Sequence, residues 1–262
     1  MAPDAKKSDL VYISNFYGSD ILVFTYPGGK YVGLISGKFA DPQGLCAAAS
    51  GNWWVVASGS DEVLEFAHGG TTPLKTLNVS GGEPAGCTVD PTSGNLAVTI
   101  LGTSGVVVFT SGSGSGTTIS DNLSATYSAA YDDKGDLFAD GFAGSTPSLV
   151  ELHKGHSKFV SITVSPSLEY PGALQWYGNY LALSGAPAGI GHFAIHGRKA
   201  KEVGVTQIAD IGGFWIQKPD VAVTDPGAEN AAIYKYPSGG SPIKVLNGPF
   251  DLPIGVTVSV AK

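Results

Sequence analysis

The chain has 262 residues, of which 43% are apolar and 14% are charged, and its formal net charge is −7. This composition excludes a disordered chain, and no run reaches the roughly 18 apolar residues of a membrane helix. The acidic balance, without any basic block, argues against nucleic acid and anionic membranes as partners. At about 150 residues per domain, the length allows one large domain or two small ones.

A repeat of 41 to 43 residues runs along the chain. Gly-Asn or Gly-Asp recurs four times, each time before an apolar run, at Gly51-Asn52, Gly94-Asn95, Gly135-Asp136 and Gly178-Asn179. The same spacing predicts two further copies, which begin at Asp9 and Asp220. Repeats of this length that hold four short strands are typical of β-propeller blades.

Turn residues divide each copy into short strands. In the first copy the strands are expected over residues 10–14, 21–26, 31–36 and 45–49. Counterparts of the second strand are expected over residues 63–67, 106–110, 149–152, 192–195 and 232–236. No segment has a helical period. The sequence therefore predicts an all-β, six-bladed β-propeller with four antiparallel strands per blade; a β-sandwich is the alternative, but it does not require equal repeats.

The two ends of the chain are expected to share one blade. Pro253-Ile254-Gly255-Val256 is a copy of Pro42-Gln43-Gly44-Leu45, whereas the chain begins in the middle of a repeat. We expect residues 254–260 to pair with residues 10–14, because closing this sheet removes an exposed edge. The predicted organisation is a tail over 1–8 and one domain over 9–262, with repeats of about 9–51, 52–94, 95–135, 136–178, 179–218 and 219–262.

The order of Pro-x-Gly, apolar strand, Gly-Asn and apolar strand resembles the NHL-repeat propellers from about Asp9 to Val260. Their relatives include the SMP-30/gluconolactonase, paraoxonase, diisopropylfluorophosphatase and virginiamycin B lyase groups. The resemblance implies that ligands bind at the channel mouth where the innermost strands begin. It also implies that the mouth holds a divalent cation in the gluconolactonase-like enzymes, through Glu, Asn and Asp ligands that often stand immediately before the Pro-x-Gly glycine. The equivalent residues here are Gln43, Ala85, Tyr127, Pro171, Gly212 and Ile254. Only Gln43 offers a metal-binding oxygen, so the usual metal site of these enzymes is not expected.

Carboxylates recur two residues before these positions. They are Asp41, Glu83, Glu169 and Asp210, with Asp251 next to the equivalent Leu252. Residues two apart share one side of a strand, so these carboxylates could form a ring at the mouth. Three interpretations stay open: a solvated acidic rim, a site for a cationic ligand or a divalent cation such as calcium or zinc, and a catalytic carboxylate.

Aromatic residues are expected near the same mouth. Phe16, Tyr17, Tyr127 and Tyr170 suit a ligand with an apolar or cationic face. Asp140 interrupts an apolar run, which predicts either that its strand ends one residue early or that Asp140 points at the mouth.

The histidines and the glycine-serine segment are expected to be structural. His68, His153 and His196 fall on one turn position at the opposite blade end. His156 lies close to His153, but no thiolate or third histidine completes a zinc site there. His192 is expected to be packed within a strand. Gly112-Ser113-Gly114-Ser115-Gly116 reads as a flexible hairpin loop rather than a nucleophile motif.

Cys46 and Cys87 lie 41 residues apart, on neighbouring copies of one strand. Two buried free thiols are expected, with an inter-blade disulfide as the alternative. The first residues lack the apolar stretch of a secretory leader, whereas the low charge and abundant Gly, Ser and Thr resemble an exported protein whose leader has been removed. An extracellular or periplasmic location is expected, and a cytoplasmic one stays open.

Two functions follow from these observations. The first is a monomeric, non-enzymatic propeller that binds a small polar or cationic ligand, or a partner protein, at the acidic mouth. The residues expected to bind are Asp41, Gln43, Glu83, Tyr127, Glu169, Asp210, Asp251, Tyr17 and Asp140. The second is a metal-assisted hydrolase or lyase of lactones, esters or phosphotriesters, with Asp41, Glu83, Glu169 and Asp210 as candidate metal ligands. The sequence assigns no catalytic residue.

Overall fold

The computed structural model describes residues 1–2, 5–187 and 189–262, so residues 3 and 4 of the expected tail lie outside the description. The described residues form strands and three short 3-10 helices, Ala5–Lys7, Ser58–Ser60 and Thr110–Gly112. This confirms the all-β class. None of the described helices is long and apolar enough to cross a bilayer. The chain packs as two compact units, Met1–Leu77 with Asp210–Lys262 (unit 1) and Asn78–Ala209 (unit 2).

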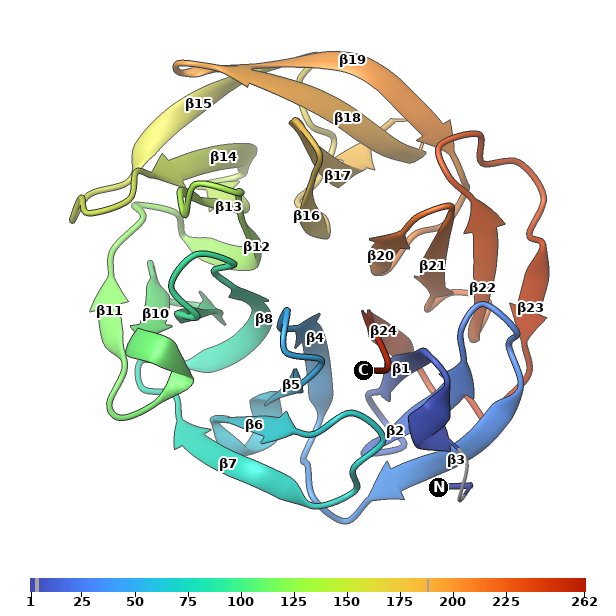
Figure 1. The fold of residues 1–262 in the computed structure, drawn as a ribbon. Coiled ribbons are helices and arrows are strands. Elements are labelled where there is room, and N and C mark those ends of the chain that lie inside the picture. Colours follow the sequence, from blue (N-terminus) through green and yellow to red (C-terminus); the bar gives the residue numbers. More distant parts are fainter. Residues whose placement is uncertain (3–4, 188) are drawn as a thin grey trace. The chain divides into compact units, whose positions relative to one another are not determined.

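Unit 1 contains three antiparallel four-stranded sheets, in the orders β24-β1-β2-β3, β4-β5-β6-β7 and β20-β21-β22-β23 (Figure 1). The first sheet has β1 Leu10–Asn15, β2 Asp20–Thr25, β3 Tyr31–Ser36 and β24 Pro253–Ser259. The second has β4 Pro42–Ala47, β5 Trp53–Ala57, β6 Glu62–Phe66 and β7 Pro73–Asn78. The third has β20 Phe214–Gln217, β21 Asp220–Asp225, β22 Asn230–Lys235 and β23 Lys244–Leu246.

Unit 2 contains one four-stranded sheet, β11-β10-β9-β8, and one eight-stranded sheet, β12-β13-β14-β15-β19-β18-β17-β16. The smaller sheet has β8 Glu83–Val89, β9 Leu96–Leu101, β10 Val106–Phe109 and β11 Thr117–Ile119. The larger sheet has β12 Ala125–Tyr131, β13 Leu137–Ala143, β14 Thr146–Leu152 and β15 Val160–Ser165, then β16 Leu174–Tyr177, β17 Tyr180–Ala186, β18 Gly189–His196 and β19 Lys199–Gln207.

The eight-stranded sheet departs from the expected series of four-stranded sheets. Strands β12–β15 and β16–β19 are two antiparallel groups, and they are joined by a parallel pairing of β15 with β19. The pairing begins at Thr163 and Lys199, and the Thr163 N–H donates to the Arg198 carbonyl over 2.9 Å. The edges join because an outer strand has unpaired backbone groups that a neighbouring edge can satisfy.

The expected strands are present along the whole chain. Each predicted counterpart of the second strand overlaps an observed strand, namely β6, β10, β14, β18 and β22. The fourth strand of the first copy was expected from residue 45 but begins at Pro42. Proline is acceptable at this first position because its missing N–H removes no ladder bond there.

The predicted pairing of the two chain ends is confirmed. Strand β24 lies beside β1 in an antiparallel ladder that pairs Leu10 with Ser259 and Tyr12 with Thr257 (Figure 1). Beyond the ladder, the Phe16 N–H donates to the Leu252 carbonyl over 3.1 Å. The N-terminal sheet therefore needs residues from both ends of the chain.

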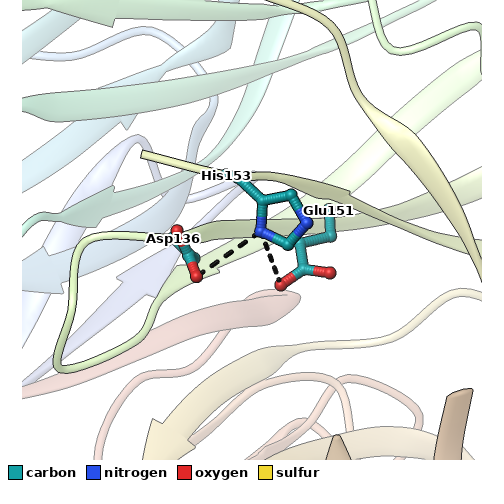
Figure 2. A group of neighbouring side chains, drawn as sticks. All are labelled: Asp136, Glu151 and His153. Carbon is teal, nitrogen blue, oxygen red and sulfur yellow. Dashed lines mark ion pairs between the residues drawn. The ribbon is translucent and has the colours of Figure 1, made fainter. Parts of the chain in front are cut away.

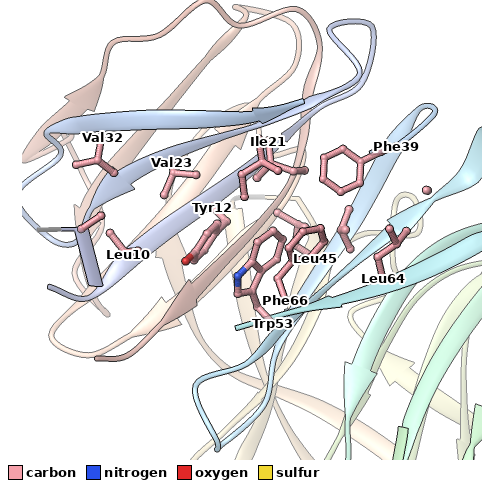
Figure 3. Close-up of a cluster of buried hydrophobic side chains, with 14 residues drawn as sticks. Leu10, Tyr12, Ile21, Val23, Val32, Phe39, Leu45, Trp53, Leu64 and Phe66 are labelled. Carbon is pink, nitrogen blue, oxygen red and sulfur yellow. The ribbon is translucent and has the colours of Figure 1, made fainter. Parts of the chain in front are cut away.

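Stacked aromatic rings fill the core between the first two sheets of unit 1 (Figure 3). The Tyr12 and Trp53 rings are stacked with centroids 4.2 Å apart, and Phe66 stacks on Trp53 at 4.7 Å. The Tyr12 hydroxyl accepts a hydrogen bond from the Gly69 N–H, and burial raises the pKa of Tyr12 to about 12. Large apolar rings of this kind contribute most of the burial that holds neighbouring sheets together.

The expectation of free thiols is wrong. Cys46 and Cys87 are the only cysteines of the sequence, both are buried, and both are disulfide-bonded. Two cysteines at one position of successive repeats can bond when the strands that carry them are neighbours. The distance between the two cysteines is not encoded in charge or hydrophobicity, so the sequence could not decide between free thiols and a disulfide.

A buried hydroxyl ties the edge strands of successive sheets together at one repeat position. We call Ser14, Thr99 and Thr224 the hydroxyl clasps. The Thr224 Oγ1 accepts from the Gly213 N–H over 2.8 Å and donates to the Ile254 carbonyl over 2.6 Å. Thr99 joins Gly86 to Tyr127 in the same way, and Ser14 joins Gly255 to Gln43.

The glycine of the Pro-x-Gly element has a structural role beside these clasps. A Cβ on Gly86 would lie 2.8 Å from the Tyr127 carbonyl oxygen, and one on Gly213 would lie 2.5 Å from the Ile254 carbonyl oxygen. Only glycine allows the two edge strands to approach this closely. Glycine at this repeat position therefore permits the close approach of Gly86 to Tyr127 and of Gly213 to Ile254.

Candidate functional site

The acidic repeat positions of unit 1 lie just before edge strands. Asp41 is half-buried and precedes β4, whereas Asp210 is exposed. Both have positive φ, 49° and 53°, as does the equivalent Leu252 at 58°. Aspartate tolerates this left-handed conformation better than most residues. The turn thus gives Asp41 and Asp210 a backbone role in addition to their charge.

The acidic positions of unit 2 are both exposed. Glu83 is the first residue of β8, and Glu169 precedes β16 and donates its N–H to the Gly185 carbonyl over 3.2 Å. Each unit therefore carries two of the four predicted carboxylates, at the starts of separate edge strands.

Unit 1 has a strong charge difference between its two strand ends. At the end where β4, β20 and β24 begin, the described residues include a single lysine, Lys38, and eight carboxylates: Asp20, Asp41, Asp61, Glu62, Asp210, Asp225, Glu229 and Asp251. The opposite strand ends carry the carboxylates Asp9 and Asp220, and the lysines Lys6, Lys7, Lys30, Lys218, Lys235, Lys244 and Lys262. We call the first of these the acidic end of unit 1.

The corresponding strand ends of unit 2 are also acidic. They carry Glu83, Asp121 and Glu169 and none of the described lysines or arginines. The opposite ends carry both signs: the basic residues Lys134, Lys154, Lys158, Arg198, Lys199 and Lys201, and the carboxylates Asp90, Asp132, Asp133, Asp136 and Glu151. Among the described residues, the strand ends where the first strand of each repeat sheet begins therefore carry no lysine or arginine in unit 2 and only Lys38 in unit 1.

Exposed tyrosines accompany these carboxylates. Tyr17 is 67% exposed, packs edge-on against Phe16, and donates its N–H to the Asp251 carbonyl. In unit 2, Tyr127 is 42% exposed against Phe142, and Tyr170 is 45% exposed next to Glu169. Gln43 is half-buried on β4, and its carbonyl accepts from Ser14. The predicted aromatic and acidic residues therefore lie on the same strand ends within each unit.

Asp140 does not end its strand, so that expectation is wrong: β13 continues to Ala143. The Asp140 side chain is completely buried and accepts hydrogen bonds from the Ser128 N–H over 3.1 Å and the Gly172 N–H over 2.6 Å. Burial raises the pKa of Asp140 to about 8, against the effect of these two bonds. Asp140 thus occupies a clasp position and accepts from Ser128 of β12 and from Gly172, which precedes β16.

The isolated histidines are packed as expected. His192 is buried, stacks on Tyr180 with ring centroids 4.7 Å apart, and bonds Thr206 through Nε2 over 3.0 Å. His68 contacts Ser259 through Nδ1 and the Ser8 carbonyl through Nε2. Both ring nitrogens of His68 are therefore engaged in structure.

A second group of titratable residues lies at the opposite strand ends of unit 2 (Figure 2). Asp136 precedes β13, Glu151 lies in β14, and His153 follows β14 by one residue. Their ligand-type atoms all lie within 4.8 Å of one another. The His153 Nδ1 is 3.6 Å from the Asp136 Oδ2 and 3.5 Å from the Glu151 Oε1. Among the described residues, this is the one such group of three.

Glu151 is the buried member of the group, at 5% exposure. Its Oε2 is buried and has no hydrogen-bond partner. Burial raises the pKa of Glu151; His153 opposes this shift, and the negative charges of Asp136 and Asp132 add to it. Sequence reasoning considered His153 with His156 and missed both carboxylates, although the Glu-x-His spacing already puts Glu151 and His153 on one face of a strand.

Unit 1 has a glutamate at the matching repeat position. Glu65 is 7% exposed; its Oε1 accepts from the Asn52 side chain over 2.8 Å, and its Oε2 pairs with the Lys75 ammonium at 3.1 Å. Asn52 stands where unit 2 has Asp136, and Ala67 stands where it has His153. Glu65 is thus compensated by its own neighbours.

The sequence matches no protein-family model, and it matches no curated protein. A chain in a crystal structure of a nidogen/laminin complex is similar over 97% of this chain and 100% of that chain, with a TM-score of 0.78 and 12% identity. The fold is a β-propeller. A chain of Kuenenia stuttgartiensis hydrazine synthase resembles the propeller over 90% of this chain and 75% of that chain, with a TM-score of 0.64 and 16% identity. At these identities the similarity concerns the fold alone.

Proposed function

We propose that this propeller is a non-enzymatic binding protein whose acidic strand ends engage the basic side chains of a partner protein. The observation that carries the proposal is the acidic end of unit 1, where the described residues include eight carboxylates and a single lysine. Charges of one sign gathered on one side attract an oppositely charged partner and speed its association, with a strong dependence on salt.

The exposed tyrosines add a second kind of contact. Lysine and arginine bind over aromatic faces as well as to carboxylates, and tyrosine is enriched at protein interfaces. Tyr17 lies against Asp251, and Tyr170 adjoins Glu169. A basic side chain that reaches either place can meet a carboxylate and a ring together, which favours arginine because its planar group does both.

The similar nidogen/laminin structure supports protein binding, because that structure is itself a complex of two proteins. This support is by analogy of fold. The charge distribution of the present chain supplies the independent argument for a basic partner.

The blade number and location belong to the same proposal. Counting β12–β15 and β16–β19 as separate blades gives the six blades that the repeats predict, in one domain over 9–262. The disulfide favours an oxidising compartment, and thus the extracellular or periplasmic location expected from composition.

The test uses an oligo-arginine peptide, with a Gly/Ser peptide of equal length as the neutral probe. Combining Asp41→Asn, Glu83→Gln, Glu169→Gln and Asp210→Asn should weaken oligo-arginine binding at least about tenfold in interferometry. Binding to the unmodified protein should weaken as salt rises. Equal affinity of the quadruple variant and the parent would contradict the proposal.

Unit 2 provides a matched control for charge alone. The pair Glu83→Gln/Glu169→Gln and the pair Asp133→Asn/Glu202→Gln each remove two negative charges from that unit. Only the first pair should weaken binding. Turnover of a lactone, ester or phosphotriester with added calcium, manganese or zinc, lost in the quadruple variant, would instead establish the metal-assisted hydrolase or lyase.

A further inference from the structure

The group of Asp136, Glu151 and His153 is built by the register of two neighbouring strands. Leu137 pairs with Leu152 in the β13–β14 ladder, so Asp136 and His153 come opposite each other one step beyond it. Glu151 and His153 are two residues apart and share a face. Three side chains, from β14 and from the residues next to β13 and β14, therefore converge, as Figure 2 shows.

The spacing of the ligand atoms fits a small tetrahedral metal ion. Zinc binds imidazole nitrogen and carboxylate oxygen at roughly 2.0–2.2 Å, which places neighbouring ligands of a tetrahedron about 3.3–3.6 Å apart. The two separations from His153 Nδ1, 3.6 Å to Asp136 and 3.5 Å to Glu151, match these edges. All ligand-type atoms of the group lie within 4.8 Å of one another, so a small adjustment of the side chains brings the third separation to the same length.

Glu151 provides an independent argument for a cation. Its carboxylate points toward His153, its side chain is 6% exposed, and its Oε2 has no hydrogen-bond partner. A buried carboxylate that keeps one oxygen without a partner is costly. Within the described residues, neither Glu151 nor Asp136 forms an ion pair with lysine or arginine.

We propose that Asp136, Glu151 and His153 form a zinc site, with one coordination position open to solvent. One imidazole and two carboxylates suit zinc and its first-row neighbours better than calcium or magnesium, which prefer oxygen ligands throughout. The His153 side chain is 46% exposed and that of Asp136 is 23% exposed, so an ion can enter from solvent. The site lies at the strand ends opposite Glu83 and Glu169, separate from the proposed binding surface.

The experiment titrates zinc chloride into tag-free, chelator-stripped full-length protein by calorimetry. The expected result is one zinc ion per chain, with calcium and magnesium binding at least about a hundredfold more weakly. Glu151→Gln and His153→Gln should each weaken zinc binding by about a hundredfold or more. Absence of one-to-one binding, or tighter binding of calcium than of zinc, would overturn the proposal.

Two controls keep this test interpretable. Glu65→Gln alters the matching buried glutamate of unit 1 and should bind zinc like the parent. His153→Gln changes a side chain that is nearly half exposed, so it tests the site even if Glu151→Gln folds poorly. Equal zinc affinity in the parent and in a folded His153→Gln protein would show an adventitious ion only. Cobalt should give a tetrahedral absorption spectrum that His153→Gln loses.

Discussion

Glu65 and Glu151 occupy one repeat position in two different units, and both are almost fully buried. Glu65 receives the Asn52 amide and the Lys75 ammonium, whereas Glu151 faces Asp136 and His153 and keeps one oxygen without a partner. The backbone around them repeats, but the compensation of the charge does not. The repeat therefore determines the position of the buried glutamate but not the residues that compensate its charge.

The clasp position shows the same contrast. Ser14 and Thr224 of unit 1 both donate and accept, because a hydroxyl can do both. Asp140 of unit 2 instead accepts from two backbone N–H groups. One unit thus holds its edge strands with neutral groups, and the other contains an acid whose protonation changes with pH.

The largest expected effect is on the pH dependence of stability. The carboxyl of Asp140 has a folded pKa of about 8 against an ordinary value of 3.8. Between these values the unfolded chain releases a proton that the folded protein keeps, so stability should fall as pH rises, by about 1.4 kcal/mol per unit at most. Urea unfolding from pH 4 to pH 8 measures this dependence.

Asp140→Thr supplies the matched control, because threonine already forms the clasp at Thr99. Its stability should lack the part of the pH dependence that Asp140 contributes. If parent and variant change in parallel from pH 4 to pH 8, Asp140 does not titrate as described.

The next effect comes from breaking a clasp in unit 1. Thr224→Val preserves shape but leaves the Gly213 N–H and the Ile254 carbonyl without their partner, which should lower the free energy of unfolding by about 2–4 kcal/mol. Thr257→Val is the control, because the Thr257 hydroxyl is buried and already has no partner. Chemical denaturation should find little loss for the control; equal losses would count against the clasp.

The smallest effect distinguishes the two glutamates directly. With a chelator present to remove metal ions, Glu65→Gln should destabilise the protein, because Lys75 loses its partner. The loss should be only about 1 kcal/mol, because the Lys75 side chain is 43% exposed and water solvates its charge. Glu151→Gln should stabilise it by a similar amount, because it removes a buried negative charge that has one oxygen without a partner and lies near Asp136. Urea midpoints of the two variants should shift in opposite directions. A shift in the same direction would remove the contrast.

Turn residues and local pattern were sufficient to predict the strands. The β24–β1 pairing followed from the repeat, because the chain begins in the middle of one copy and ends with the strand that this copy lacks. The same spacing places Asp140 level with the clasp residue Thr99, but also with Ile13, which is one residue before the clasp Ser14. A buried acid looks like an interruption of a strand until its backbone donors are known. The repeat alone cannot show that Gly172, from a neighbouring edge strand, satisfies it.

A candidate site could be predicted when its residues follow from one repeat position, and could not when they meet across strands. The carboxylates before each edge strand follow from one sequence position, whereas Asp136, Glu151 and His153 meet only through the register of β13 and β14. The disulfide likewise depends on a distance between repeats. Contacts across strands carry no fixed sequence spacing, so they required the structure.

The clasp between Ser14 and Gly255 joins residues 241 positions apart. At about 5–20 residues per second, a ribosome makes β24 roughly 12–50 s after β1. During that interval β1 has one unpaired edge, and Ser14 has no glycine N–H to accept from. The N-terminal sheet can therefore be completed only late in synthesis, and the nascent chain must be kept from pairing with other strands until then.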